Sequence, residues 1–326
     1  MKGSRRLKKA IGGLRRRFRP AAIILMYHRV ANLQSDPLSL AVSIDHFAQQ
    51  LDYLARTCQP VRLSELVAAL QQGTLPRRTV AVTFDDGYYD NYQDAYPLLA
   101  SARIPATIFV SSDMVDSRQE FWWDDLERIL LSSARRPTCL QLSIRARDFE
   151  WQMNSAEDRH RAYGALYPVL KSLALDERQL VLQQLTCWAD ISPAGRADYR
   201  AMTRTELAEL SSSGLIEIGG HTRNHPQLST LSADAQQAEI VGGKQRLEDL
   251  TGSAIDTFAY PYGQATDFEN ETLETVRASG YRAALTTIHG YVEPGDDAFR
   301  LRRCAVFNWD SDTFRRKLEE FFVTRD

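Results

Sequence analysis

Short apolar runs alternate with longer amphipathic stretches along most of the chain. The apolar runs have the length of buried strands, and we expect strands over residues 23–27, 79–84, 106–110, 215–219, 257–260 and 282–286. Between them, apolar residues recur at helical spacing, which predicts helices over residues 44–57, 64–72, 91–101, 204–213, 233–250 and 269–279. This alternation is typical of an α/β protein whose parallel strands are covered by helices.

Local signals mark several of the helix ends. Gly73, Gly214 and Gly280 follow the last positions of three helices, where glycine readily adopts the left-handed backbone that ends a helix. Thr203 and Glu206 have the spacing of a capping box and predict the start of another helix. These signals agree with the boundaries that the apolar pattern gives.

Two polar motifs stand out against the apolar pattern. Thr83-Phe84-Asp85-Asp86-Gly87 closes one predicted strand, and His221 and His225 stand four residues apart in Gly-Gly-His-Thr-Arg-Asn-His-Pro. Two His and one Asp make a three-ligand metal site with open positions, and the second Asp is left to act as a base. Alone, each motif could be a turn or a pair of surface residues. Together they favour a metal-dependent hydrolase.

These motifs resemble the polysaccharide deacetylase family, carbohydrate esterase family 4 with its NodB-type domain. The resemblance implies a distorted (β/α) barrel in which Asp85 is the general base. It also implies that Asp86, His221 and His225 bind a divalent metal. We expect zinc, with Co²⁺, Ni²⁺ or Mn²⁺ as alternatives.

Two further family motifs are altered in this chain. Residues 258–263, Phe-Ala-Tyr-Pro-Tyr-Gly, resemble a third motif, but Ala259 stands where many members have an Arg that orients the base. The backbone N–H of Tyr262 is a candidate oxyanion donor. In the last motif, Leu-x-His, Thr287 replaces the His that supplies the general acid.

Two other His could replace that acid. His28 ends the predicted strand at 23–27, and its surroundings resemble the N-terminal strand of the biofilm poly-N-acetylglucosamine deacetylases, whose motif order is permuted. That resemblance implies His28 as the acid, with a structural His as the alternative. His289, two residues beyond Thr287, is the second candidate.

Residues 113–202 break the alternation of strands and helices. They contain helical stretches at 122–132 and 165–174, so we expect a helical insertion there, within a deacetylase domain that spans residues 21–326. Trp122 and Trp123 could stack on sugar rings. Because adjacent helical residues point apart, at most one is expected to face substrate, and packing in the core is favoured for each.

Composition fits a folded enzyme with a separate basic tail. The chain has 326 residues, of which 44% are hydrophobic, and four widely spaced Cys that we expect to be free thiols. Residues 1–20 hold nine of the 40 Lys and Arg and no acid, which leaves 31 bases against 42 acids in the remainder. The rest of the chain therefore carries a formal charge of about −11.

The tail also has an apolar stripe. One face of a helix would carry Leu7, Ile11, Leu14 and Phe18. We therefore expect residues 1–20 to contact anionic membranes as an amphipathic helix. A disordered basic leader and a nucleic-acid tail are the alternatives. The apolar run at 21–27 is too short to span a bilayer and lacks a cleavage signal. We therefore expect a cytoplasmic enzyme, with peripheral attachment to the inner face of the membrane as the option that this tail adds.

The sequence thus predicts a hydrolase that removes N-acetyl groups from amino sugars of a bacterial exopolysaccharide, surface glycan or lipid-linked precursor. No nucleic-acid partner is expected. A catalytically impaired glycan-binding relative is one alternative, because Ala259 and Thr287 depart from the family pattern. An O-acetyl esterase acting on a polysaccharide and an Fe(II) oxygenase with the same ligand types are the others.

Overall fold

The computed structural model describes residues 22–132 and 137–323. The basic tail at 1–20, and with it the predicted amphipathic helix, lies outside the described residues. None of the helices in the described part combines the length and the apolarity needed to cross a bilayer.

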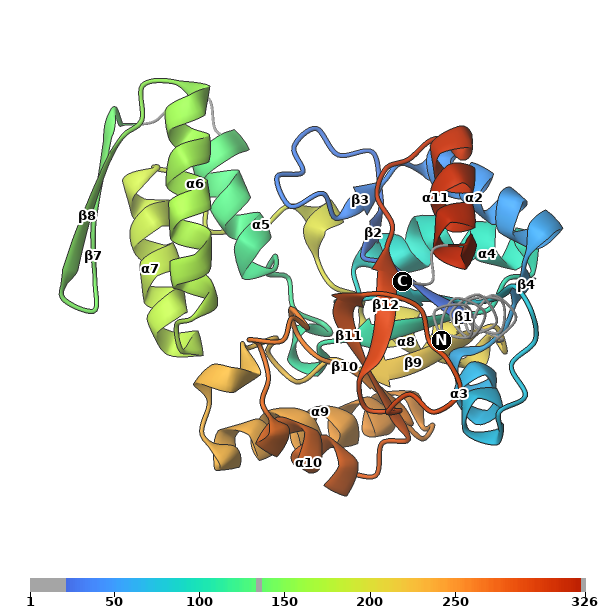
Figure 1. The fold of residues 1–326 in the computed structure, drawn as a ribbon. Helices are drawn as coiled ribbons and strands as arrows, with labels where there is room; N and C mark the ends of the chain where they lie inside the picture. The colour runs from blue at the N-terminus through green and yellow to red at the C-terminus, as the bar shows by residue number, and fades with distance from the viewer. Residues whose placement is uncertain (1–21, 133–136, 324–326) are drawn as a thin grey trace, which may run out of the picture.

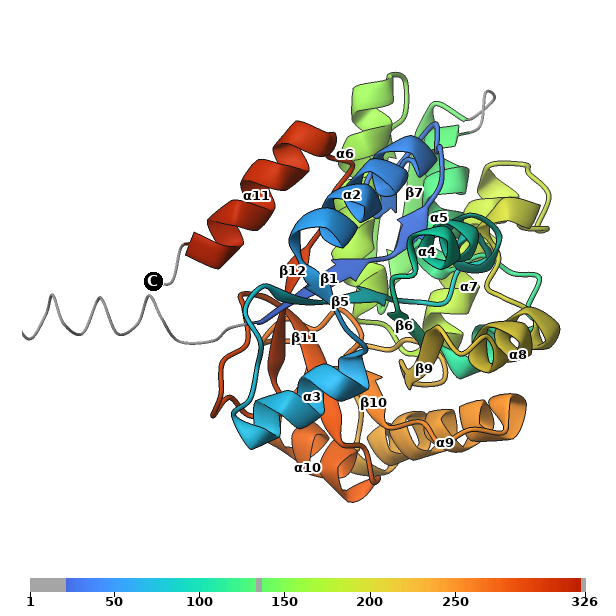
Figure 2. The same cartoon turned by 90° about the vertical axis from the view of Figure 1, so that its right-hand side faces the viewer.

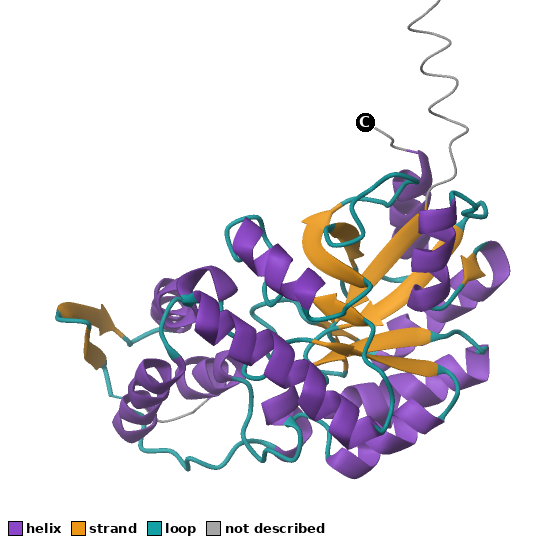
Figure 3. Cartoon of the chain, turned by 90° about the horizontal axis from the view of Figure 1, so that it is seen from below, coloured by secondary structure: helices purple, strands orange, loops and turns teal. Residues whose placement is uncertain are grey.

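Seven parallel strands close into a barrel (Figures 1 and 3). In chain order they are β1 (Ala22–Tyr27), β5 (Thr79–Phe84), β6 (Ala106–Val110), β9 (Ile216–Gly220), β10 (Thr257–Ala259), β11 (Ala283–His289) and β12 (Leu301–Ala305). Strand β1 lies between β12 and β5, and its pairing with β5 runs from Ala22 opposite Thr79 to Tyr27 opposite Phe84. The predicted (β/α) barrel is confirmed.

Three short strands lie outside the closed ring. Strand β4 (Gln59–Pro60) pairs with the start of β5, and β2 (Arg29–Val30) pairs with β3 (Ala41–Val42) beyond the end of β1. Strand β12 was not predicted, because its sequence Leu-Arg-Arg-Cys-Ala is not a continuous apolar run.

Helices surround the barrel (Figure 2). They are α2 (Ile44–Thr57), α3 (Leu63–Gln72), α4 (Tyr96–Ala102), α8 (Arg204–Ser212), α9 (Ala233–Thr251), α10 (Asn270–Ala278) and α11 (Ser311–Val323). Six of these coincide with predicted helices to within a few residues, while α11 was not predicted. The glycine signals are also confirmed, since Gly73, Gly214 and Gly280 all have left-handed backbone angles.

Alternate residues of the strands enter two different apolar clusters, as expected for parallel strands that are buried on both faces. Ile23, Leu25 and Tyr27 of β1 belong to the cluster that includes Phe47 of α2. Ile24 belongs to a second cluster with residues of the neighbouring strands and with the apolar face of α3. The strand ends are therefore held rigidly, which fixes the positions of the residues that follow them.

The segment between β6 and β9 projects from one side of the barrel (Figure 1). It contains α5 (Trp122–Glu127), continued by a π turn at Arg128–Ser132, the antiparallel hairpin of β7 (Cys139–Ile144) and β8 (Arg147–Gln152), and the helices α6 (Ala156–Lys171) and α7 (Leu175–Trp188). The hairpin and α7 were not predicted. This segment has its own apolar cluster, which includes Trp122 and Trp123.

Candidate active site

The ends of neighbouring strands bring the predicted polar residues together. Asp85 and Asp86 follow β5, His221 follows β9, and His28 follows β1, so all of them lie at the carboxyl end of the barrel. Asp86 has a left-handed backbone, φ 75°, which turns its side chain away from that of Asp85. The two carboxylates consequently face different groups, Asp86 toward the two His and Asp85 toward Arg303.

The loop that carries His221 and His225 is held in a strained conformation. Thr222 and His225 have φ values of 64° and 53°, which L-residues seldom adopt and which cluster at functional sites. Glu239 of α9 accepts hydrogen bonds from the backbone N–H groups of Arg223 and Asn224, each at 2.9 Å. Helix α9 thus stabilises the loop in a backbone conformation that its own residues disfavour.

A close approach of α9 to the loop requires a glycine. A Cβ atom at Gly243 would lie 2.9 Å from the carbonyl carbon of Thr222, which is closer than real side chains pack. The first His of the loop is fixed separately, because its Nδ1 lies 2.7 Å from the carbonyl oxygen of Ala259. That contact directs Nε2 of His221 toward Asp86, in the manner of metal-binding His.

The side chains of Asp86, His221 and His225 converge at one buried point. Their ligand atoms all lie within 4.8 Å of one another. Oδ1 of Asp86 is 3.5 Å from Nε2 of His221 and 3.3 Å from Nε2 of His225. Two ligands at ordinary zinc bond lengths and tetrahedral angles stand about 3.3 Å apart.

The neutral ring of His225 and a buried oxygen of Asp86 also favour the binding of a metal cation. Burial, and then the charges of His221 and Arg178, hold the pKa of His225 well below its usual range, so its ring is neutral. Oδ1 of Asp86 is buried and has no hydrogen-bond partner among the described residues. A buried carboxylate oxygen without a donor, facing two imidazoles, is the arrangement that a divalent metal would satisfy.

The second carboxylate, Asp85, is held by Arg303 of β12. Nη1 and Nη2 of this Arg donate to Oδ1 and Oδ2 of Asp85, both at 2.7 Å, and both side chains are buried. Burial raises the pKa of Asp85, but the charge and hydrogen bonds of Arg303 outweigh it, and the pKa lies below its ordinary value. Asp85 is therefore ionised, with a fixed orientation.

Arg303 is the functional residue that the sequence analysis missed. Ala259 removes the Arg expected in the third motif, and Arg303 reaches the same carboxylate from another strand. Its Nε also donates to the carbonyl of Thr286 at 2.8 Å, which anchors the guanidinium to the neighbouring strand β11. Two consecutive Arg within an otherwise apolar Leu301–Ala305 were the available signal.

The candidate acids differ clearly in position. Nε2 of His28 lies 4.0 Å from Oδ2 of Asp85, and the His28 side chain is one-fifth exposed. His289 is exposed, and its ring packs against Phe321 of α11. Only His28 of this pair shares a cavity with Asp85.

Tyr262 also has the strained backbone found at functional sites, with φ 59°. Its carbonyl accepts a hydrogen bond from the Thr287 hydroxyl at 2.6 Å, so the residue that replaces the family's His supports this loop. No acceptor for the Tyr262 N–H is found within residues 22–132 and 137–323. The aromatic ring stands edge-on to His225 at 4.6 Å.

One cavity of about 300 Å³ joins these groups. Its lining includes His28, Asp85, His221, His225, Tyr262 and Thr287 from the barrel, Leu38 and Leu40 from the loop before β3, and Trp123, Tyr167 and Lys171 from the projecting segment. Trp122 and Trp123 are both buried, as favoured from the sequence, and Trp123 also faces the cavity beside His225. Asp86 is buried and is not among the residues that line this cavity.

Similar proteins include several named deacetylases. A Bacillus subtilis protein, YxkH, whose name assigns it provisionally to the polysaccharide deacetylases, is 23% identical over 88% of this chain and 72% of its own length. A poly-beta-1,6-N-acetyl-D-glucosamine N-deacetylase of Staphylococcus epidermidis is 30% identical over 30% of this chain. That match spans only 38% of the staphylococcal protein.

Solved structures show the same fold at low sequence identity. The deacetylase PplD of Streptococcus pyogenes, solved in complex with acetate, superposes with a TM-score of 0.61 at 20% identity, over 92% of this chain and 99% of PplD. IcaB from Ammonifex degensii gives a TM-score of 0.60 at 21% identity, over 94% and 98% of the two chains.

A family model also matches this chain. The pattern described as Polysaccharide deacetylase matches residues 72–133 and 161–284, which together exceed half of the chain. The matched residues contain Asp85, Asp86, His221, His225 and Tyr262, whereas His28 and Arg303 lie outside them. The match agrees with the barrel fold and with the motifs that converge at the carboxyl end of the barrel. The chain therefore belongs to the polysaccharide deacetylase family.

Proposed function

We propose that this protein is a metal-dependent hydrolase that removes N-acetyl groups from amino sugars of a bacterial exopolysaccharide, surface glycan or lipid-linked precursor. One observation carries the proposal. A buried Asp86, His221 and His225 cluster stands beside a second carboxylate, Asp85, which Arg303 keeps ionised. The resemblance to an N-deacetylase of an N-acetylglucosamine polymer supports the choice of an N-acetylated glycan as substrate.

Asp86, His221 and His225 would hold the metal, with zinc expected from their number and type. When bound, such a cation polarises the substrate carbonyl and makes a water more acidic. The chain's own residues perform the proton transfers. Asp85 accepts the proton of the attacking water, because its carboxylate is ionised and fixed in orientation.

The other half of the reaction needs an acid and an oxyanion donor. The Tyr262 N–H stabilises negative charge on the acetyl oxygen as the tetrahedral centre forms. His28 then donates a proton to the nitrogen of the leaving amine, which is expelled poorly unless it is protonated. The position of His28, at the same cavity as Asp85, supports this assignment over His289.

The contact of Asp85 with Arg303 bears on the alternative of an impaired glycan-binding relative. That reading was motivated by the loss of the orienting Arg at Ala259. The buried Arg303 makes the equivalent contact from β12, which supports an active enzyme.

The experiment combines metal analysis with acetate release from N-acetylated and O-acetylated glycans. We expect one divalent metal per chain and release from N-acetylated substrates. His221→Ala or His225→Ala should lose the metal, and Asp85→Asn should retain the metal but lose about 10²- to 10⁴-fold in rate. His289→Ala is the matched control. Full metal occupancy in both His mutants, or wild-type turnover in Asp85→Asn, would contradict the assignment.

A further inference from the structure

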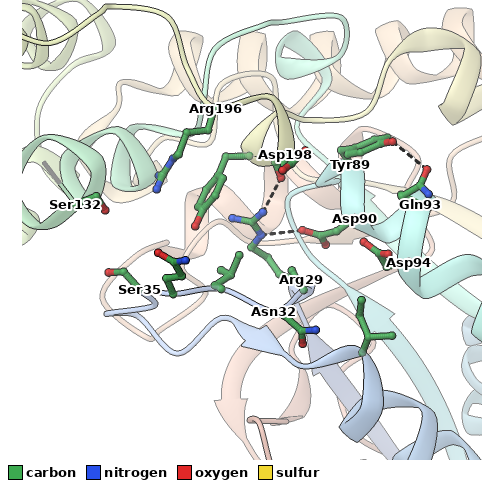
Figure 4. A pocket seen from close by; sticks show the side chains of 15 residues that line it. Arg29, Asn32, Ser35, Tyr89, Asp90, Gln93, Asp94, Ser132, Arg196 and Asp198 are labelled. Atoms are coloured by element: carbon green, nitrogen blue, oxygen red, sulfur yellow. Dashed lines mark hydrogen bonds and ion pairs between the residues drawn. The ribbon is translucent and has the colours of Figure 1, made fainter.

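The projecting segment, residues 111–215, is fastened to the barrel through Arg29 of β2. The guanidinium of this Arg lies 4.2 Å from the centre of the Tyr199 ring. Its Nη2 donates to the carbonyl of Asp198 and its Nε donates to Asp90, both at 2.8 Å, and Figure 4 shows both hydrogen bonds. Arg29 is only 1% exposed. The segment is therefore fixed to the barrel at a place separate from the candidate catalytic cavity.

A second contact of the segment falls on the loop after β10, residues 260–267, which carries the candidate oxyanion donor. Lys171 is the last residue of α6, and its Nζ lies 4.4 Å from the centre of the Tyr262 ring. The same Nζ donates to Oδ1 of Asp267 at 2.5 Å. An ammonium group is attracted both by an aromatic face and by a carboxylate. Lys171 therefore joins two distant positions of this loop.

Asp267 carries the contact from Lys171 to the backbone of the loop. Its side chain is fully buried, and its Oδ2 accepts a hydrogen bond from the backbone N–H of Gln264 at 3.0 Å. Its own N–H donates to the carbonyl of Gln264 at 2.9 Å, and its Oδ1 accepts from the Gln227 side chain at 3.1 Å. A buried carboxylate is tolerated only when it is paired and hydrogen-bonded. Loss of the Lys171 ammonium would therefore disturb the bonds that shape the loop.

The barrel holds the same loop through Thr287 of β11. The Thr287 hydroxyl donates to the carbonyl of Tyr262 at 2.6 Å, and its backbone N–H donates to the carbonyl of Gly263 at 3.1 Å. The approach is close, because a Cβ atom at Gly263 would lie 2.7 Å from the nitrogen of Thr287. The groups that follow the Tyr262 N–H are thus fixed, while this N–H has no acceptor in the described part of the chain. A fixed, unused donor is what an oxyanion site requires.

The projecting segment also contacts the far end of the Tyr262 side chain. Nε1 of Trp122 donates to the Tyr262 hydroxyl at 3.1 Å. The ring that Lys171 covers is consequently held at its face and at its tip by residues of one segment. Lys171 lines the candidate catalytic cavity, but Asp267 already neutralises its charge. This pairing favours a role within the protein over a role in binding an anionic ligand.

We propose that Lys171 is a positioning residue that holds the backbone N–H of Tyr262 in place for the tetrahedral intermediate. The inference rests on the proposed function, because the oxyanion role of Tyr262 belongs to it. Lys171 acts through the Tyr262 ring and through Asp267. An oxyanion donor acts mainly in the transition state, so a displaced loop lowers kcat and leaves KM nearly unchanged. The projecting segment then supplies part of the catalytic geometry as well as a wall of the cavity.

The test measures acetate release from an N-acetylated β-1,6-linked glucosamine tetramer by the metal-loaded enzyme. Lys171→Met removes the charge but keeps a long side chain. We expect it to lower kcat by about 10²-fold, the loss that a small misplacement of a catalytic group causes, with KM changed by less than about threefold. Lys171→Arg keeps a cation for both contacts and should regain most of the lost kcat.

Two further variants separate positioning from a general loss of stability. Lys244→Met is the matched control, because Lys244 makes the same two kinds of contact, with Glu248 at 3.1 Å and with the Tyr281 ring at 4.8 Å. Neither partner belongs to the loop, so kcat should stay at the wild-type value. The double mutant Lys171→Met/Asp267→Asn leaves no unpaired buried charge, which protects the fold. Its kcat should be no lower than that of Lys171→Met alone, because the pair acts as one unit.

Hydrogen exchange followed by mass spectrometry gives a readout that does not depend on activity. The amides of residues 260–267 should exchange about tenfold faster in Lys171→Met than in the wild type, because the loop opens more often. In Lys244→Met these amides should exchange as in the wild type.

A higher KM with an unchanged kcat in Lys171→Met would overturn the proposal, because Lys171 would then bind substrate. An equal loss of kcat in Lys244→Met would also overturn it, as would wild-type exchange of residues 260–267 in Lys171→Met. Acetate release by the wild type is scored separately. If the wild type releases none, the proposed function fails, and the exchange rates decide by themselves whether Lys171 holds the loop.

Discussion

Replacing Arg303 by Met should destabilise the protein and disable the candidate base. The guanidinium is fully buried and makes two 2.7 Å hydrogen bonds to Asp85, whose side chain is only 3% exposed. Removing one partner of such a pair leaves an uncompensated buried charge, which costs about 3–5 kcal/mol. The lost contact to the Thr286 carbonyl adds to this, so we expect the upper part of that range.

The pH dependence of the deficit has a defined sign. In the wild type, Asp85 has a pKa below its ordinary value, so its ion pair stabilises the fold at neutral pH and this contribution is lost as the pH falls through that pKa. Without Arg303, burial becomes the dominant influence on Asp85 and raises its pKa, against the smaller opposing charges of His221 and His28. The deficit should therefore be largest near neutral pH and shrink in acid, where a protonated Asp85 needs no cation.

The assay is urea unfolding of the metal-free protein, since bound metal would add its own stabilisation. Arg303→Lys keeps the charge but not the two parallel hydrogen bonds, and should lose less stability than Arg303→Met. Arg302→Met, at the exposed neighbouring position, is the control. We also expect acetate release by Arg303→Met to fall by about 10²-fold or more. A stability within about 1 kcal/mol of the wild type would refute the assigned role of this ion pair.

Three other predictions concern separate parts of the chain. His28→Ala should retain metal and lose activity on N-acetylated glycans more than on activated aryl acetates, whose leaving groups need little protonation; a greater loss in His289→Ala would reverse the assignment. Burial raises the pKa of Asp124 to about 8, so the free energy of unfolding should fall as the pH rises from about 4 to 8. Urea unfolding at a series of pH values should show this fall in the wild type but not in Asp124→Asn. Deleting residues 1–19 should abolish salt-sensitive co-sedimentation with anionic vesicles, and unchanged co-sedimentation would exclude the membrane role.

The sequence predicted the parts of the site whose signals are local. The apolar run of β5 and the Asp pair after it lie next to each other in the chain, and His221 and His225 belong to one loop. Their convergence followed from parallel strands and from the family resemblance. The membrane tail and a cytoplasmic location stay predictions, because residues 1–20 lie outside the described part.

Arg303 could not be predicted in the same way. It is separated from Asp85 by 218 residues, and only the closure of the barrel through β1 and β12 brings the two together. Strands are predicted from continuous apolar runs, and the charged Arg303 interrupts such a run. The residue that binds Asp85 is therefore also the reason why β12 was not predicted. The strand β7 of the hairpin, by contrast, could have been predicted from the sequence. Its buried residues Leu140, Leu142 and Ile144 alternate with exposed residues at the two-residue period of a strand.

The closure of the barrel also sets the order in which the site can be assembled during synthesis. The candidate metal ligands come from the middle of the chain, where β5 and β9 are both neighbours of β6. The partner of the base is on β12, the last strand, which pairs with the first strand β1. A nascent chain that ends before residue 301 would contain every candidate metal ligand but no Arg303. Every candidate metal ligand, the candidate base and the candidate acid are therefore synthesised before the Arg that orients the base, and the strand that closes the barrel supplies this Arg last.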